Sequence, residues 1–177
     1  MSELRQRLLA AGPQLTGRHA FAELSGELIA SAAGLGVEQF AESFPSVVAY
    51  VDALQEQFLD EVRNRVIKVT TETVPGLLRM KLATESYLAT CIEYRGLRGW
   101  FIEARLRPEL SDSLRRRNQI YGVVIGSEFS HLGWPAPQAA ARLYLAMINE
   151  AATLEQRAGQ ARTDVREVLW DFLDGGP

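Results

Sequence analysis

The chain has 177 residues and a net charge of −3, with 47% hydrophobic and 23% charged residues. This ordinary globular balance argues against disorder, and the weak negative charge gives no general attraction to nucleic acid or to anionic membranes. A lone cysteine, Cys91, excludes an internal disulfide and a multi-cysteine zinc site. The N-terminus shows no export signal, and no apolar run approaches the roughly 18 residues that span a bilayer. We therefore expect a cytoplasmic protein that does not contact a membrane.

Apolar residues recur at intervals of three and four along the whole chain, which predicts an all-α protein of about nine helices. The first helix begins near Ser2, and Gly12-Pro13 should kink or end it, because proline lacks the backbone donor and clashes with the preceding turn. The last helix should begin with Thr163 as its cap. The other helices are predicted at 22–33, 37–44, from Pro45-Ser46 to about 70–73, 77–94, 97–106, 109–129 and 138–158.

The sequence has no recognisable catalytic or metal-binding set. His19 and His131 are far apart, and there is no glycine-rich phosphate loop, no Gly-x-Ser-x-Gly and no His-Glu-x-x-His. Cys91, on the apolar face of a predicted helix, is more typical of a small core residue than of a nucleophile. We expect neither an enzyme nor a bound metal or cofactor.

The stretch 33–46 has the layout of a helix-turn-helix. A small-residue turn at Ala33-Gly34 precedes a short helix, and Phe44-Pro45-Ser46 opens a longer one. Yet residues 19–50 contain no Lys or Arg, and residues 1–50 hold three Arg against five Glu, a balance of −2. A DNA-binding protein gains much of its affinity by neutralising phosphates with cations. The pattern and the charge therefore point in different directions.

The arrangement resembles the TetR family of bacterial regulators, in which a three-helix DNA-binding head is joined to a larger helical body that binds an effector and dimerises. Phe21, Ser25 and Ile29 fall where that head carries an aromatic residue, a phosphate-contacting hydroxyl and a core aliphatic residue. Residues that match the end of the family head in type and spacing are Ala33, Gly34, Leu35, Phe40, Phe44 and Ser46. The resemblance implies a helix-turn-helix head at 1–46 and an effector-binding and dimerisation domain at 47–177.

The departures from the family lie where it contacts DNA. Ala41 replaces the phosphate-contacting aromatic residue, and Glu42 and Ser43 replace polar or basic residues. Val47 stands where a lysine is expected. Gly12-Pro13 and Thr16-Gly17 also interrupt the first helix, where the family has apolar residues. Taken together, the core-type positions of the family head are kept in this sequence, whereas the phosphate-contacting positions are not.

Two interpretations of the head stay open: a homodimer that binds operator DNA, or a TetR-fold protein that has lost DNA binding and captures a ligand or a protein partner. For the first, the resemblance places the DNA contacts at Ser25, Gly36, Val37, Glu38, Gln39, Ser43 and Ser46. Further phosphate contacts can come from Arg5, Arg7 and Arg18. Gln39 suits an adenine edge, and Glu38 or Glu42 can accept a hydrogen bond from a cytosine amine.

In the body, the resemblance predicts a pocket for a small apolar effector, lined by Met80, Tyr87, Cys91, Trp100, Phe101, Asn118 and Tyr121. Plain core packing is the alternative for these residues. The last two helices predict a two-fold, four-helix dimer contact, with closure of a monomer core as the alternative. Its predicted residues are Leu143, Met147, Ala151, Leu154, Val165, Leu169 and Phe172.

Overall fold

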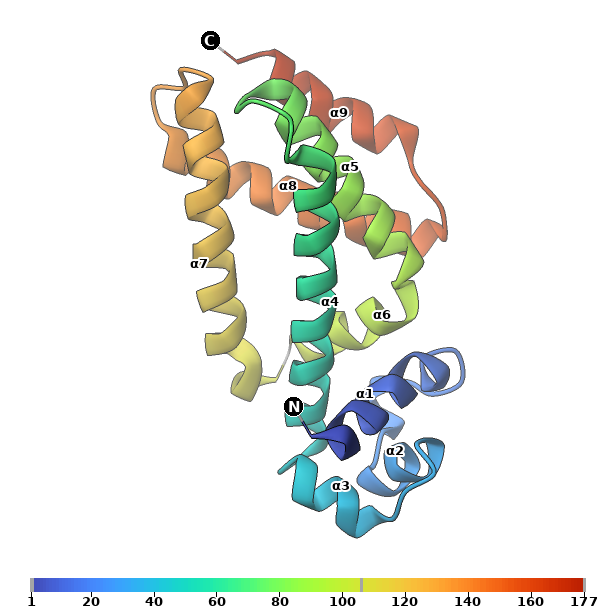
Figure 1. Ribbon diagram of the computed structural model, residues 1–177. Coiled ribbons are helices and arrows are strands. Elements are labelled where there is room, and N and C mark those ends of the chain that lie inside the picture. The colour runs from blue at the N-terminus through green and yellow to red at the C-terminus, as the bar shows by residue number, and fades with distance from the viewer. Residues whose placement is uncertain (1, 106, 177) are drawn as a thin grey trace. The chain divides into compact units, whose positions relative to one another are not determined.

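The computed structural model describes residues 2–105 and 107–176, except for the side chains of residues 108–118. Throughout this part of the chain the regular elements are helices, which confirms the all-α prediction (Figure 1). In chain order they are α1 (Glu3–Leu15), the 3-10 helix η1 (Phe21–Glu23), α2 (Gly26–Ala32), α3 (Val37–Ser43), α4 (Val47–Thr70), α5 (Leu77–Glu93), α6 (Arg95–Ala104), α7 (Pro108–His131), α8 (Pro137–Ala158) and α9 (Thr163–Asp174).

The chain forms two compact units. Unit 1 consists of Met1–Asp60 and Tyr94–Asp112, and unit 2 consists of Glu61–Glu93 and Ser113–Pro177. Unit 1 therefore holds α1 to α3, the first part of α4 and α6, whereas unit 2 holds the rest of α4, α5, most of α7, α8 and α9. The predicted head, 1–46, lies within unit 1, and its boundary with the body stays a prediction.

An aromatic cluster fills the core of the helical bundle in unit 1. Phe40 of α3 and Phe44 just after it are buried, and Tyr50 of α4 is buried beside them. The Tyr50 ring lies 6.0 Å from that of Phe40 and 5.2 Å from that of Phe44, centroid to centroid. Its hydroxyl donates to the Leu8 carbonyl oxygen at 3.0 Å, which ties α4 to α1. The prediction that Phe40 and Phe44 are core residues is confirmed.

Of the two outcomes predicted for Gly12-Pro13, a kink or an end of the first helix, the end is not found there, because α1 continues to Leu15 with Pro13 inside it. Pro13 removes the backbone donor that this position would otherwise supply to the preceding turn. Gly12 has a packing role instead. A Cβ at this position would lie 2.9 Å from Leu54 Cδ1 and 3.0 Å from the Tyr50 hydroxyl, so glycine lets α1 and α4 approach each other closely.

The second helix begins later than predicted, and the last helix begins at Thr163 as predicted but with a different cap residue. The helix expected at 22–33 is the short η1 followed by α2, because Ser25 caps α2 and its Oγ accepts the Leu28 N–H at 3.1 Å. The cap of α9 is Arg162 rather than Thr163. The Arg162 N–H donates to Glu155 Oε1 at 2.9 Å, so a side chain from α8 does the work of a local cap.

The core of unit 2 lies where α5, α8 and α9 pack together (Figure 1). Tyr144 of α8 stacks on Phe172 of α9 with ring centroids 6.0 Å apart, and Phe129 of α7 meets Tyr144 edge-on at 5.7 Å. The Tyr144 hydroxyl also shares a 2.7 Å hydrogen bond with Thr84 of α5. These contacts join four helices of the unit around one aromatic side chain.

Candidate nucleic-acid interface

The turn between α2 and α3 is built by backbone contacts that close α2. Gly34 adopts φ +67°, a left-handed conformation that favours glycine. The Leu35 N–H then returns to the Ala30 carbonyl at 2.9 Å. Gly26 gives α2 room against α3, since a Cβ there would lie 2.7 Å from Phe40 Cδ1. A short helix, a glycine turn and a second short helix thus fold as the sequence predicted.

The start of α3 presents several of the predicted DNA-contacting residues. Gly36 is its cap residue, and the Gln39 side-chain oxygen accepts the Gly36 N–H at 2.9 Å. This bond leaves the Gln39 amide nitrogen as the group that can reach a base edge. Val37 and Glu38 are exposed beside it. The predicted contacts Gly36, Val37, Glu38 and Gln39 therefore occupy one helix end.

The three serines predicted to contact DNA also form hydrogen bonds within unit 1. Ser25 and Ser46 are exposed helix caps, and Ser46 Oγ accepts the Ala49 N–H at 3.1 Å, as Ser25 Oγ does from Leu28. Each hydroxyl keeps its own proton to donate to a phosphate. Ser43, at the end of α3, is half-buried, and its carbonyl accepts a hydrogen bond from Arg5.

Two of the three arginines near the N-terminus are held on helix ends within unit 1. Arg5 Nη1 donates to the Ser43 carbonyl at 2.8 Å, and its guanidinium lies 4.1 Å from the centre of the Phe44 ring. Arg7 Nη2 donates to the Ala33 and Gly34 carbonyls at 3.1 and 3.4 Å. Both arginines thus satisfy carbonyls at the C-terminal ends of helices, where cations are favoured. These contacts could not be predicted from local sequence, because the paired residues are 26 to 38 positions apart.

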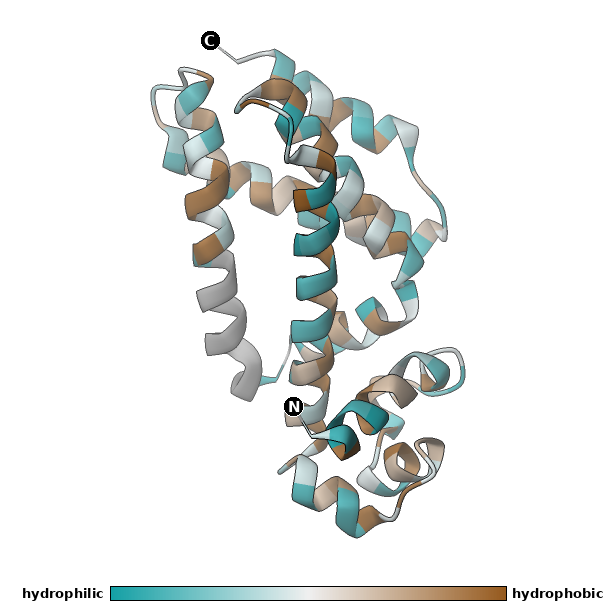
Figure 2. Ribbon diagram, in the orientation of Figure 1, coloured by the Kyte–Doolittle hydropathy of each residue, from teal (hydrophilic) through white to brown (hydrophobic). Residues whose placement is uncertain are grey.

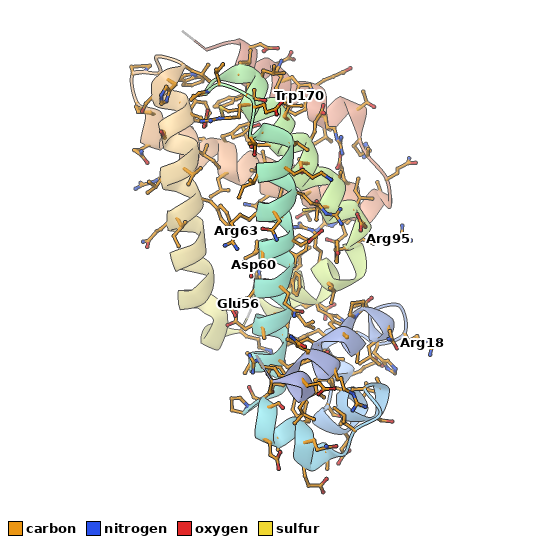
Figure 3. The ribbon with its side chains drawn as sticks, viewed as in Figure 1. Arg18, Glu56, Asp60, Arg63, Arg95 and Trp170 are labelled. Carbon is orange, nitrogen blue, oxygen red and sulfur yellow. The ribbon has the colours of Figure 1, made fainter. Side chains whose placement is uncertain are left out.

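The exposed face of α3 is acidic, whereas one arginine of the head points away from it into solvent. Arg18 is exposed and extends outward from the loop after α1 (Figure 3). Glu38 and Glu42 are exposed on α3 four residues apart, which places them on one face of the helix, and Ala41 is exposed between them. A phosphate approaching this face meets two carboxylates.

The predicted effector-binding residues are divided between the units. Trp100 and Phe101 belong to unit 1, whereas Met80, Tyr87, Cys91 and Tyr121 belong to unit 2, and the Asn118 side chain lies outside the described residues. Two polar groups of this set already have partners. Tyr87 donates to Asn149 Oδ1 at 3.1 Å, and Trp100 Nε1 donates to the His19 carbonyl at 2.9 Å.

Unit 1 contains an open concavity of about 300 Å³ that the sequence did not predict. The loop after α1 meets α6 at Gly96, where a Cβ would lie 2.3 Å from Thr16 Oγ1, so glycine permits this close approach. The lining residues are Thr16, Gly17, Arg18, His19, Ala20, Gly96, Gly99, Trp100 and Glu103. Of the predicted effector residues, Trp100 alone lines it.

The predicted dimer residues differ in exposure. Leu143 is 62% exposed, whereas Met147, Leu154, Val165 and Phe172 are half-buried. Ala151 and Leu169 are each 2% exposed, so these two residues are core residues and would contribute almost no accessible surface to a dimer contact. Both residues belong to helices that pack on α5 and on each other.

The described residues lack two further features, a metal-ligand cluster and a helix suited to a membrane. They contain no group of three or more His, Cys, Asp or Glu side chains placed to hold a metal ion. None of their helices combines the length and apolar character needed to cross a membrane.

The helix order, the three-helix bundle and the glycine turn define the fold of TetR-type regulators. Solved structures with this fold cover nearly the whole chain. A transcriptional regulator from Rhodococcus sp. Rha1 aligns with a TM-score of 0.77 and 15% identity over 97% of this chain and 94% of its own. A regulatory protein TetR from Rhodobacter sphaeroides aligns with a TM-score of 0.74 and 16% identity over 99% of this chain and 100% of its own.

A third structure with the same fold is NalD, the secondary repressor of the MexAB-OprM multidrug efflux pump in Pseudomonas aeruginosa. It aligns with a TM-score of 0.64 and 18% identity over 98% of this chain and 96% of its own. No protein-family model and no curated protein matches the sequence. The chain therefore has the TetR-type fold that the sequence resemblance predicted, and these structures are regulators rather than enzymes.

Proposed function

We propose that this protein is a homodimeric transcriptional regulator of the cytoplasm that binds operator DNA through its N-terminal head, 1–46, and that catalysis is no part of its function. The observation that carries the proposal is the α2–Gly34–α3 arrangement. It buries Phe40 and leaves Val37 and Glu38 exposed at the start of α3. The fold shared with known regulators supports the same role.

In this proposal the head binds DNA with few contacts from Lys or Arg side chains. Phosphates are bound by backbone N–H groups at helix starts and by the hydroxyls of Ser25, Ser43 and Ser46, which position a duplex without full charge neutralisation. The Gln39 amide and the Glu38 carboxylate read base edges in the major groove. Gly36 and Val37 allow the start of α3 to lie close to the bases.

The dimer contact is proposed on the outer faces of α8 and α9. Leu143, with the half-buried Met147 and Leu154 on the same helix, supplies an apolar strip. The charges around it are complementary. Exposed Arg142 and Arg157 lie on α8, and exposed Glu167 and Asp171 lie on α9. A two-fold axis that sets α8 against the partner's α9 brings opposite charges together.

Regulation is proposed to be a two-state shift. A small apolar ligand in the body, 47–177, binds one arrangement of the dimer better than the other and so changes how the two heads fit a pair of DNA half-sites. Within unit 2, the predicted lining residues Met80, Tyr87, Cys91 and Tyr121 supply the apolar surface that such a ligand needs.

A second function is favoured by a specific observation. Arg5 and Arg7 are held on backbone carbonyls, and Glu38 and Glu42 are exposed on α3. A head with these features suits a TetR-fold protein that no longer binds DNA and instead captures a ligand or a protein partner.

A selection experiment separates the two. The full-length protein is incubated with random 20-base-pair duplexes at about 50 mM salt, where electrostatic binding is strong. Bound duplexes are enriched and measured by fluorescence anisotropy. The regulator proposal predicts an enriched sequence that Glu38→Ala or Gln39→Ala changes. Failure to retain any duplex at this salt concentration would overturn it in favour of the second function.

A further inference from the structure

The α7 helix carries an exposed apolar face within unit 2. Ile120, Val123 and Val124 are 63%, 65% and 58% exposed, and their spacing of three and four places them on one side of the helix. Figure 2 colours part of the described portion of α7 as hydrophobic. Gly126 and Phe129, on another side of the same helix, are buried. A surface helix ordinarily turns polar and charged residues to solvent, so this segment of α7 has apolar residues where water-facing polar ones are expected.

The sequence of this segment is also free of charge. Residues 118–127 contain no Asp, Glu, Lys or Arg, although 19 basic and 22 acidic residues are spread through the chain. The next residue, Glu128, is paired with Arg79 and accepts the Gly76 N–H, so it is committed within unit 2. Depletion of charge is the compositional mark of an interface core and serves no purpose on a water-facing helix.

Gly122 gives an independent indication. Glycine inside a helix is about 1 kcal/mol less favourable than alanine. At Gly126 packing explains the glycine, since a Cβ would lie 2.3 Å from the Gln138 side chain. At Gly122, by contrast, no atom lies within 4 Å of an added Cβ. Nothing described within unit 2 thus requires glycine at 122. Glycine there would permit a close approach by a surface outside the chain.

We propose that the α7 face, residues 119–127, is part of the contact between two copies of this chain. A two-fold axis places like segments together, and a segment without charge is compatible with its own copy because no like charges meet. The proposal rests on the dimer proposed above and extends it from two helices to three. A standard interface buries about 800 Å² per partner, more than three aliphatic side chains supply. The remaining area comes from α8, which joins α7 through the Phe129–Tyr144 contact.

The test uses two variants of one exposed residue in the full-length chain, Val123→Glu and Val123→Lys. Each places identical charges on the facing copies, so we expect the dimer dissociation constant to rise about tenfold or more in sedimentation equilibrium. An equimolar mixture of the two variants should form a heterodimer close to wild type in affinity, because Glu then faces Lys. Val74→Lys, at a residue 80% exposed in the loop between α4 and α5, is the matched control and should leave the dimer unchanged.

The outcomes are distinct. Weakening by both variants with rescue in the mixture supports the α7 contact. Wild-type dimerisation by both variants overturns it, and if Leu143→Lys on α8 then weakens the dimer, the proposed dimer stands without α7. A wild-type chain that is monomeric at every concentration overturns both proposals. Circular dichroism melting shows whether each variant is folded, and Val123 is exposed enough that its replacement should not unfold the chain.

Discussion

At the scale of single residues, Glu155 is the most heavily committed polar side chain in unit 2. It is fully buried on α8, accepts two hydrogen bonds from Arg166 of α9 at 2.6 and 2.9 Å, and accepts the Arg162 N–H that begins α9. The carboxylate also holds the pKa of Arg166 above its ordinary value through these hydrogen bonds. One carboxylate therefore fixes where α9 starts and how it lies on α8.

We predict that Glu155→Ala lowers the free energy of unfolding by about 3 kcal/mol, the low end for breaking a buried pair, because Arg166 keeps some access to water. Urea unfolding measures the change. Asp164→Asn is the control, since Asp164 forms an exposed pair with Arg162 and should leave the unfolding midpoint unchanged. Equal effects of the two variants would contradict a special role for Glu155.

Tyr144 gives a prediction about pH. Burial raises the pKa of its hydroxyl to about 12, and the hydrogen bond that it shares with Thr84 opposes that shift. Because the folded pKa lies above the unfolded value, the stabilisation is complete below about pH 10 and is lost as the pH rises toward 12. Thermal melting between pH 9 and 12 should show this loss, and Tyr144→Phe should make it shallower. A slope unchanged by the substitution would show that Tyr144 does not contribute.

At the scale of elements, the contact between α2 and α3 depends on the absence of a side chain at Gly26. Gly26→Ala places a Cβ against the Phe40 ring, and we predict a loss of about 1–3 kcal/mol in the free energy of unfolding. Gly17→Ala, where no atom lies within 4 Å of the added Cβ, serves as the control. If the Gly26 variant is as stable as wild type in urea unfolding, the helix packing described for the head is wrong.

The α3 element also predicts a gain of function. Ala41 and Glu42 are exposed and Val47 is half-buried, so Ala41→Tyr, Glu42→His and Val47→Lys together supply the missing phosphate contacts. We expect affinity for random duplex DNA to rise at least tenfold near 100 mM salt, since each new cation adds a salt-dependent contact. Glu72→His with Val74→Lys, two exposed loop residues, changes the net charge equally and controls for it. No gain over that control would contradict the view that missing cations limit the head.

At the scale of the whole molecule, the periodicity of apolar residues was enough to predict an all-helical chain and the order of its helices. The glycine turn and the two phenylalanines were enough to predict a helix-turn-helix, and the resemblance that they carry predicted a three-helix head. The helix ends were harder, because Gly12 and Glu155 act through residues far along the chain. The anchoring of Arg5 and Arg7 was missed for the same reason, since a cation near a helix end is favourable only where the tertiary structure brings them together.

The division of the predicted effector residues was equally out of reach of the sequence. Helical spacing shows that Met80, Tyr87 and Trp100 face inward, but not which core each one enters. Tyr87 and Trp100 use their polar atoms for contacts within their own units. A residue pattern thus predicts burial more securely than it predicts a shared cavity.

In the proposed regulator the head binds DNA with almost no help from cations, and the salt dependence of binding is the measurement that tests this. The affinity for the selected duplex is measured by anisotropy from about 50 to 200 mM salt, where log K falls with a slope of about −0.9 per neutralised phosphate. With Arg5 and Arg7 committed to carbonyls, we predict a slope between about −1 and −3. A slope of about −6 or steeper would contradict the claim.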